Sequence, residues 1–135
     1  MSESGMSVRV PVAPGLWTDE AEPRLIGGRR ADGEIVFPMP AGDAAAFVEP
    51  TLLSRRGTLW SWTTQGFEPK EPYSGPQPFQ PFLIGYVELP GEVIVETRIV
   101  DAAPADLVIG MAMIFAVVPF DDARSTYAFR PERQP

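Results

Sequence analysis

The sequence contains no cysteine and no histidine among its 135 residues. It therefore has no disulfide, no thiolate nucleophile, no imidazole base and no thiolate or imidazole ligand for a metal ion. Because structural zinc sites are built from those ligands, we expect no structural zinc. The glycine-rich phosphate loops and the spaced carboxylates of calcium loops are also missing, so we predict no metal site and no cofactor.

The same absences leave little for catalysis. A nucleophile or base would have to be a hydroxyl, a carboxylate, a tyrosine or Lys70, the single lysine of the chain. The acidic pairs Asp19-Glu20 and Asp121-Asp122 are sequence neighbours, and neighbours on a strand point to opposite faces. They form no evident acid–base dyad. We therefore predict that the chain has no catalytic residue and is not an enzyme.

Positive charge is scarce, since 11 basic residues face 18 acidic ones and the net charge is −7. Proteins that bind nucleic acid normally need a surplus of positive charge to displace counterions from phosphate. The two basic pairs, Arg29-Arg30 and Arg55-Arg56, are interpreted as solvated side chains with acidic neighbours. We predict no nucleic-acid partner.

Long apolar runs are missing too. The longest, Val108 to Phe120, is interrupted by Gly110 and Pro119 and falls short of the roughly 20 residues that a spanning helix needs. The start, Met1 to Val10, is polar and lacks the apolar centre of a signal peptide. We therefore expect a cytoplasmic protein that makes no membrane contact.

Proline and glycine are abundant, with 16 and 12 residues, and they divide a single domain into short elements. The Asp32-Gly33 step between two apolar runs predicts a hairpin. Apolar segments between turn residues predict five strands, at about 52–65, 82–89, 92–100, 111–119 and 126–130, and one short helix within 101–108. The strand at 111–119 is apolar on both faces and should be central. Five antiparallel strands with a long first strand indicate an all-β chain closed as an OB-fold barrel; an SH3-like barrel is the alternative.

The connection at 66–82 contains five prolines and four aromatic residues. Proline stiffens such a loop, so it can present Tyr73, Phe79 and Phe82 to a partner at a low entropic cost. The alternative is that the loop packs back on its own barrel. Trp60 and Trp62 lie two apart on a predicted strand and should share one face. That shared face indicates one role for both: core packing, partner binding or, with less support from the charge, base stacking.

Several segments, in this order and spacing, resemble the acyl-CoA-associated OB-fold family. They are Gly28-Arg29-Arg30-Ala31-Asp32-Gly33 with Phe37-Pro38, the barrel entry from Ser54 to Thr63, the strand from Phe82 to Leu89, Ile109-Gly110-Met111, and Tyr127-Ala128-Phe129-Arg130-Pro131. The usual members of this family carry a zinc ribbon before the barrel. Here Arg30 stands at the position of the first cysteine and the second cysteine pair is missing, so the resemblance implies a degenerate, metal-free ribbon-like hairpin before the barrel.

The resemblance also implies the organisation and role of the chain. We expect an extended or flexible arm at 1–15, a ribbon-like segment at 16–46 and the barrel at 47–135. Family members are partners of thiolases or thiolase-like aldolases that act on acyl-CoA in steroid side-chain, aromatic or lipid degradation. This implies a hetero-oligomer in which the chain is a non-catalytic accessory subunit, with acyl-CoA as a candidate ligand at the shared interface. The alternative is a stand-alone OB module that binds single-stranded nucleic acid or another ligand.

Overall fold

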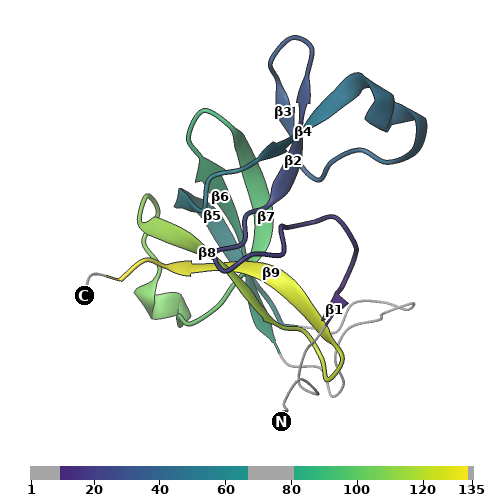
Figure 1. The fold of residues 1–135 in the computed structure, drawn as a ribbon. Coiled ribbons are helices and arrows are strands. Elements are labelled where there is room, and N and C mark those ends of the chain that lie inside the picture. The colour runs from purple at the N-terminus through teal and green to yellow at the C-terminus, as the bar shows by residue number, and fades with distance from the viewer. Residues whose placement is uncertain (1–9, 67–80, 134–135) are drawn as a thin grey trace.

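The computed structural model describes residues 10–66 and 81–133, and its strands form two sheets (Figure 1). The larger sheet contains β1 (Val10–Pro11), β5 (Arg56–Gln65), β6 (Phe82–Leu89), β7 (Val93–Ile99), β8 (Ala112–Pro119) and β9 (Arg124–Pro131). The smaller sheet contains β2 (Ile26–Arg30), β3 (Ile35–Val36) and β4 (Val48–Leu52).

The larger sheet closes on itself as a five-stranded barrel. Strands β5, β6 and β7 form an antiparallel meander, β7 then pairs with β9 in parallel, and β9 and β5 both pair with β8. The short β1 adds to β9 in parallel outside this circuit. One parallel pairing between the third and the fifth strand of an otherwise antiparallel barrel is the OB-fold arrangement, which confirms the predicted fold class.

Alternating apolar residues build the core of the barrel. On β6 and β7, Val87, Leu89 and Val95 are fully buried, while Phe115 of β8 meets Phe129 of β9 edge to face with ring centroids 5.8 Å apart. These side chains point inward because successive residues of a strand alternate between its two faces. The rest of the main core cluster consists of Leu25, Leu53, Leu59, Leu83, Ile99 and Met113.

The smaller sheet contains the hairpin predicted at Asp32-Gly33, which is formed by β2 and β3, and a third strand, β4, that the sequence analysis did not predict. Gly33 has a φ of 91°, the left-handed conformation that glycine tolerates, and the Asp32 carboxylate accepts a hydrogen bond from the Glu34 amide at 2.9 Å. β4 pairs with β2 over its whole length. The barrel strand expected from Leu52 therefore begins only at Arg56, because Leu52 belongs to β4.

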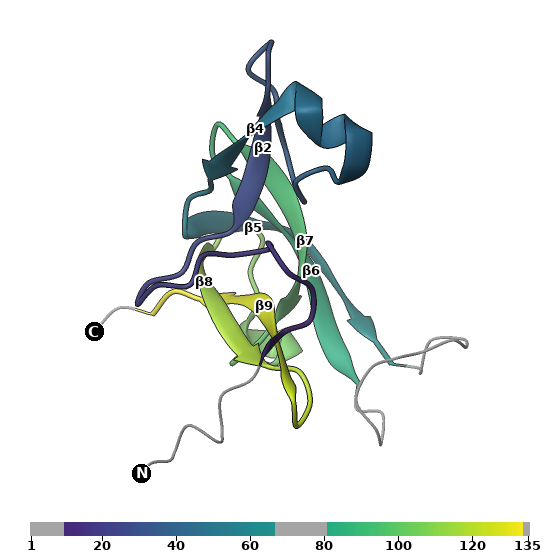
Figure 2. The same cartoon turned by 45° about the vertical axis from the view of Figure 1, so that its right-hand side comes forward.

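Two buried leucines join the smaller sheet to the barrel. Leu25 precedes β2 and Leu53 follows β4; the amide of Leu53 donates to the Leu25 carbonyl at 2.9 Å, and both side chains belong to the barrel core cluster. Figures 1 and 2 show the smaller sheet projecting beyond one end of the barrel. Because β4 begins at Val48, the smaller sheet uses residues on both sides of the boundary predicted at 46/47, and that division of the chain stays a prediction.

Among the described residues, two short 3₁₀ segments lie in the connections. The loop or helical turn expected at 41–46 is η2 (Gly42–Phe47), and the short helix expected within 101–108 is the single turn η3 (Pro104–Asp106).

Candidate partner interface

A β-bulge in β5 separates the two predicted interface tryptophans. Leu59 pairs with Val87 and Ser61 with Tyr86, so Trp60 is an extra residue between two consecutive positions of β6. An extra residue shifts the alternation of the strand by one. Trp60 consequently points outward, whereas Trp62 is opposite Gly85 and packs against the core cluster. The expectation that both share one face is wrong, because it assumed regular alternation from Trp60 to Trp62.

The outward ring of Trp60 meets Tyr86 of β6. Their centroids lie 6.4 Å apart at an interplanar angle of 82°, an edge-to-face pair. Trp60 is 56% exposed, Tyr86 39% and Ile94 of β7 42%. Ile94 is opposite Glu88 and therefore one diagonal step from Tyr86. We call Trp60, Tyr86 and Ile94 the wall patch, since they lie on the outer wall formed by β5, β6 and β7.

Phe82 is the third predicted interface residue that the structure describes. It lies at the other end of this wall. The guanidinium of Arg98 lies 3.7 Å above its ring and 5.3 Å from the ring of Phe120. A cation over an aromatic face is attracted by the ring quadrupole. Phe82 is half-buried, so part of its surface is already used within the chain.

A second arginine supports the same end of the barrel. Arg124 lies 4.9 Å from the Phe120 ring centroid, and its Nε and Nη2 donate to the Asp121 carboxylate at 2.8 and 2.7 Å. These hydrogen bonds, with one from the Ala123 amide, lower the pKa of the Asp121 carboxyl below its ordinary value. Of the acidic pair Asp121-Asp122, the Asp121 carboxylate therefore has a structural role, since it accepts these hydrogen bonds.

The predicted loop anchors Tyr73 and Phe79 lie outside the described residues. Of the five predicted interface residues, the structure places Trp60 on the exposed wall, Trp62 against the core and Phe82 beneath Arg98; it does not gather them at one point.

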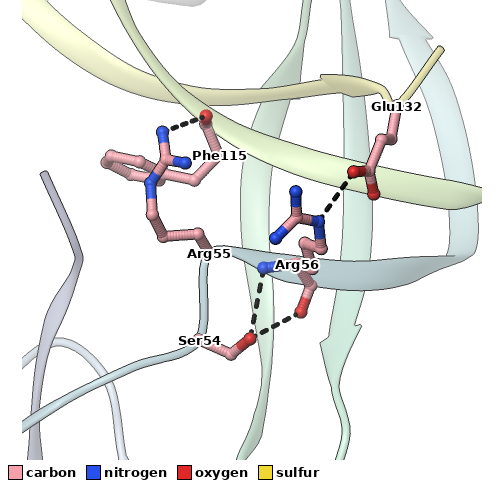
Figure 3. A network of polar contacts seen from close by, with 5 residues as sticks. All are labelled: Ser54, Arg55, Arg56, Phe115 and Glu132. Atoms are coloured by element: carbon pink, nitrogen blue, oxygen red, sulfur yellow. Dashed lines mark hydrogen bonds and ion pairs between the residues drawn. The ribbon is translucent and has the colours of Figure 1, made fainter. Parts of the chain in front are cut away.

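The basic pair Arg55-Arg56 fastens the entry to the barrel (Figure 3). Arg55 Nε donates to the Pro23 carbonyl at 3.1 Å, and its Nη2 reaches the Phe115 carbonyl at 3.5 Å. Arg56 Nε donates to Glu132 at 2.7 Å, and this hydrogen bond and the charge of Glu132 raise the pKa of the guanidinium. Arg55 therefore ties the segment before β2 to β8, whereas Arg56 ties the start of β5 to the end of β9.

A groove of about 360 Å³ lies where the hairpin meets the barrel. Phe37 contacts Tyr127 edge to face at 5.7 Å on its rim, and the Tyr127 hydroxyl donates to the Glu96 carbonyl at 3.1 Å. Burial raises the pKa of the Tyr127 hydroxyl, and the charge of Glu96 adds to that shift.

Within residues 10–66 and 81–133, no three histidine, cysteine, aspartate or glutamate side chains gather as they would around a metal ion. No helix in this part of the chain has the length and apolar character needed to cross a membrane.

Sequence reasoning missed Tyr86 and Ile94. Both lie in strands that were predicted with nearly correct bounds, at the outward positions of an alternating pattern. The alternation itself was the available signal: an aromatic and an isoleucine occupy positions that a solvent-facing wall normally gives to polar side chains.

The family model described as "ChsH2, C-terminal OB-fold domain" matches residues 51–118. The chain belongs to this family. That range begins within β4 and runs through β8, so it includes the bulge of β5 and the whole wall patch. The match confirms the resemblance drawn from the sequence.

A solved structure of the Ltp2-ChsH2(DUF35) aldolase has a chain of similar fold. The TM-score is 0.60 at 20% sequence identity, and the superposition covers 80% of this chain and 84% of that chain. The superposition covers 80% of this chain, whereas the barrel strands and the loops between them make up less than two thirds of it. The similarity of fold therefore extends beyond the ChsH2-type barrel. No curated protein matches the sequence.

Proposed function

We propose that this chain is a non-catalytic accessory subunit that binds and supports a thiolase-like enzyme, either a thiolase or an aldolase, acting on acyl-CoA. The observation that carries the proposal is the exposed Trp60–Tyr86 pair on the wall of a ChsH2-family barrel. The similarity of fold to a chain of the Ltp2-ChsH2(DUF35) aldolase supports the choice of enzyme class.

Exposed aromatic pairs of this kind favour a protein partner. Tryptophan and tyrosine are enriched among the interface residues that contribute most to binding, and contiguous exposed apolar surface typically marks an interaction site. Trp60 is itself the unpaired residue of the bulge, but the backbone on both sides of it is held, because Leu59 and Ser61 pair with β6 and Thr58 pairs with both β6 and β8. A ring on such a rigid support loses little conformational freedom when a partner covers it.

The wider setting is part of the same proposal. It comprises a cytoplasmic hetero-oligomer, acyl-CoA at the shared interface, and a role in steroid side-chain, aromatic or lipid degradation. We also propose that Tyr73 and Phe79 of the 66–82 loop join Trp60, Trp62 and Phe82 in contacting the enzyme.

The test begins with partner identity. The tagged chain should retrieve a thiolase-fold protein from its native host, and the two purified proteins should form a complex of defined mass by light scattering. A chain that binds none of the host's thiolase-fold proteins, or that binds mixed single-stranded oligonucleotides with a micromolar constant, would overturn the proposal.

Two variants then test the residues. Trp60→Ala should weaken the complex by about 30-fold, since loss of an aromatic anchor typically costs about 2 kcal/mol. Phe47→Ala is the matched control, because Phe47 is an aromatic residue that is 77% exposed at the end of η2, outside the barrel strands; its isotherm should not change. Tyr73→Ala with Phe79→Ala should also weaken binding by about 30-fold or more.

A further inference from the structure

The wall patch is interleaved with carboxylates. The register pairs Tyr86 with Glu96 and Glu88 with Ile94, so the two apolar side chains occupy one diagonal and the two glutamates the other. Both glutamates are exposed. Trp60 extends the apolar diagonal through its contact with Tyr86. We call Glu88 and Glu96 the acidic frame.

A second apolar segment lies beside the bulge. The amide of Gly110 donates to the Leu59 carbonyl at 2.7 Å, which holds the preceding residues, Val108 and Ile109, next to the backbone that carries Trp60. Both side chains are exposed. The β7–β8 connection therefore holds two further exposed apolar side chains near the bulge that carries Trp60.

The described residues supply no positive charge inside this frame. The outward positions of β6 and β7 from Tyr86 to Glu96 hold two carboxylates and no basic side chain. The next outward residue of β7, Arg98, is two positions beyond Glu96 and lines the same groove, with its guanidinium over the ring of Phe82. The net charge of −7 adds a negative field over the whole molecule.

Charge restricts what can cover the wall. Solvent stabilises Glu88 and Glu96 while the wall is open, but a purely apolar cover would remove that water and leave two carboxylates without partners, which is costly. A second copy docked by two-fold symmetry would place the same acidic frame on both sides. A single strand of nucleic acid would bring phosphates to the same carboxylates.

From this geometry we infer that the wall patch docks on a complementary surface of the partner enzyme, an apolar depression bordered by arginine or lysine side chains that meet the acidic frame. The inference rests on the proposed function and specifies the enzyme's side of the interface. Opposite charges around an apolar centre accelerate encounter and fix the register of docking. The association should therefore be steered by charge and be sensitive to salt.

The experiment compares two double variants of equal net charge, each titrated against the purified enzyme partner. Glu88→Lys with Glu96→Lys reverses the acidic frame. Glu20→Lys with Asp43→Lys makes the same charge change at two exposed positions outside the barrel strands. At low salt the frame variant should lose at least about tenfold in affinity and most of its association rate, and the control should lose less than about threefold.

A milder pair separates steering from misfolding. Glu88→Gln with Glu96→Gln keeps the shape of the side chains, so its thermal melt should match that of the wild type, while the slope of the association rate against salt should become shallower.

Equal losses for the frame and control variants, or an unchanged isotherm for the frame variant, would overturn this inference and leave the accessory role intact. A wild-type chain that binds no thiolase-fold protein would instead overturn the proposed function, and the inference with it. A wild-type homodimer abolished by Trp60→Ala would assign the wall to a second copy and refute the inference.

Discussion

The two sheets of this protein are stabilised in different ways. The barrel surrounds its own core and closes through Phe115 and Phe129, whereas the smaller sheet is anchored by Leu25 and Leu53, which flank β2 and β4 and lie in the core of the barrel. In the smaller sheet Gly27 also leaves no room for a side chain, since an added Cβ would lie 2.7 Å from the backbone carbonyl oxygen of Val36. A small sheet without cysteine or histidine thus depends on its neighbour for order.

The difference predicts which changes affect one region and which affect both. Removing a residue from the barrel core should destabilise the whole chain. Removing a junction residue should loosen the smaller sheet first, because local opening follows the distribution of buried contacts.

The largest effect is expected for Phe115→Ala. Truncation of a fully buried phenylalanine leaves a cavity and should lower the free energy of unfolding by about 3–5 kcal/mol. Chemical denaturation measures the loss, and Val117→Ala, a truncation at an exposed position of the same strand, should cost less than about 1 kcal/mol. Equal costs for the two variants would mean that β8 does not face the core as described.

Leu25→Ala tests the dependence of the smaller sheet. The loss should be about 2–5 kcal/mol, and amide exchange should accelerate more in Ile26–Arg30 than in Val93–Ile99. Leu52→Ala makes the same chemical change at an exposed position two residues before the barrel entry and should have a small effect. Uniform acceleration in both strands would show instead that the two sheets open as one unit.

Arg55→Ala removes a polar attachment between the same regions. The carbonyls of Pro23 and Phe115 lose their guanidinium donor, and the expected cost is about 1–3 kcal/mol. Arg55→Lys keeps the charge but not the forked geometry, so it should restore only part of the loss. Full restoration by lysine would indicate that charge alone, and not the two directed hydrogen bonds, holds the junction.

Tyr127→Phe gives the smallest effect and a pH signature. The variant loses the hydrogen bond to the Glu96 carbonyl, worth about 0.5–1.5 kcal/mol at neutral pH. In the wild type the raised pKa means that the folded chain keeps the hydroxyl proton at a pH where the unfolded chain has lost it. Stability from this group is therefore complete below about pH 10 and falls as the pH rises beyond it, whereas the variant should lack that alkaline loss. Parallel pH curves for the two proteins would contradict this account.

Strong local patterns predicted the barrel strands well. Phe82–Leu89 was found with its observed bounds because a mainly apolar run lies between Pro81 and Pro90, and proline typically marks the end of a strand. The Asp32-Gly33 hairpin was found because its turn chemistry is local. Both predictions depend only on residues that are close together in the sequence.

The errors concern pairings that are distant in sequence. β4 contains Pro50 and was not predicted, because only its partner β2 makes it a strand. The bulge that separates Trp60 from Trp62 arises where β5 pairs with β6, and no pattern within β5 reveals it. Because this bulge was not predicted, the contact between Trp60 and Tyr86 was not predicted either. The sequence analysis singled out Trp60 but not Tyr86.

The position of β9 in the barrel has a kinetic consequence. This strand follows the other barrel strands in the sequence, yet it pairs with β7, with β8 and with β1, whose residues lie more than a hundred positions earlier. Closure must therefore wait for contacts between distant segments, and folds dominated by such contacts reach the native state in roughly milliseconds to seconds, far more slowly than helical bundles. Until β9 arrives, the open edges of β7 and β8 can pair with other chains, so refolding at high concentration should compete with aggregation.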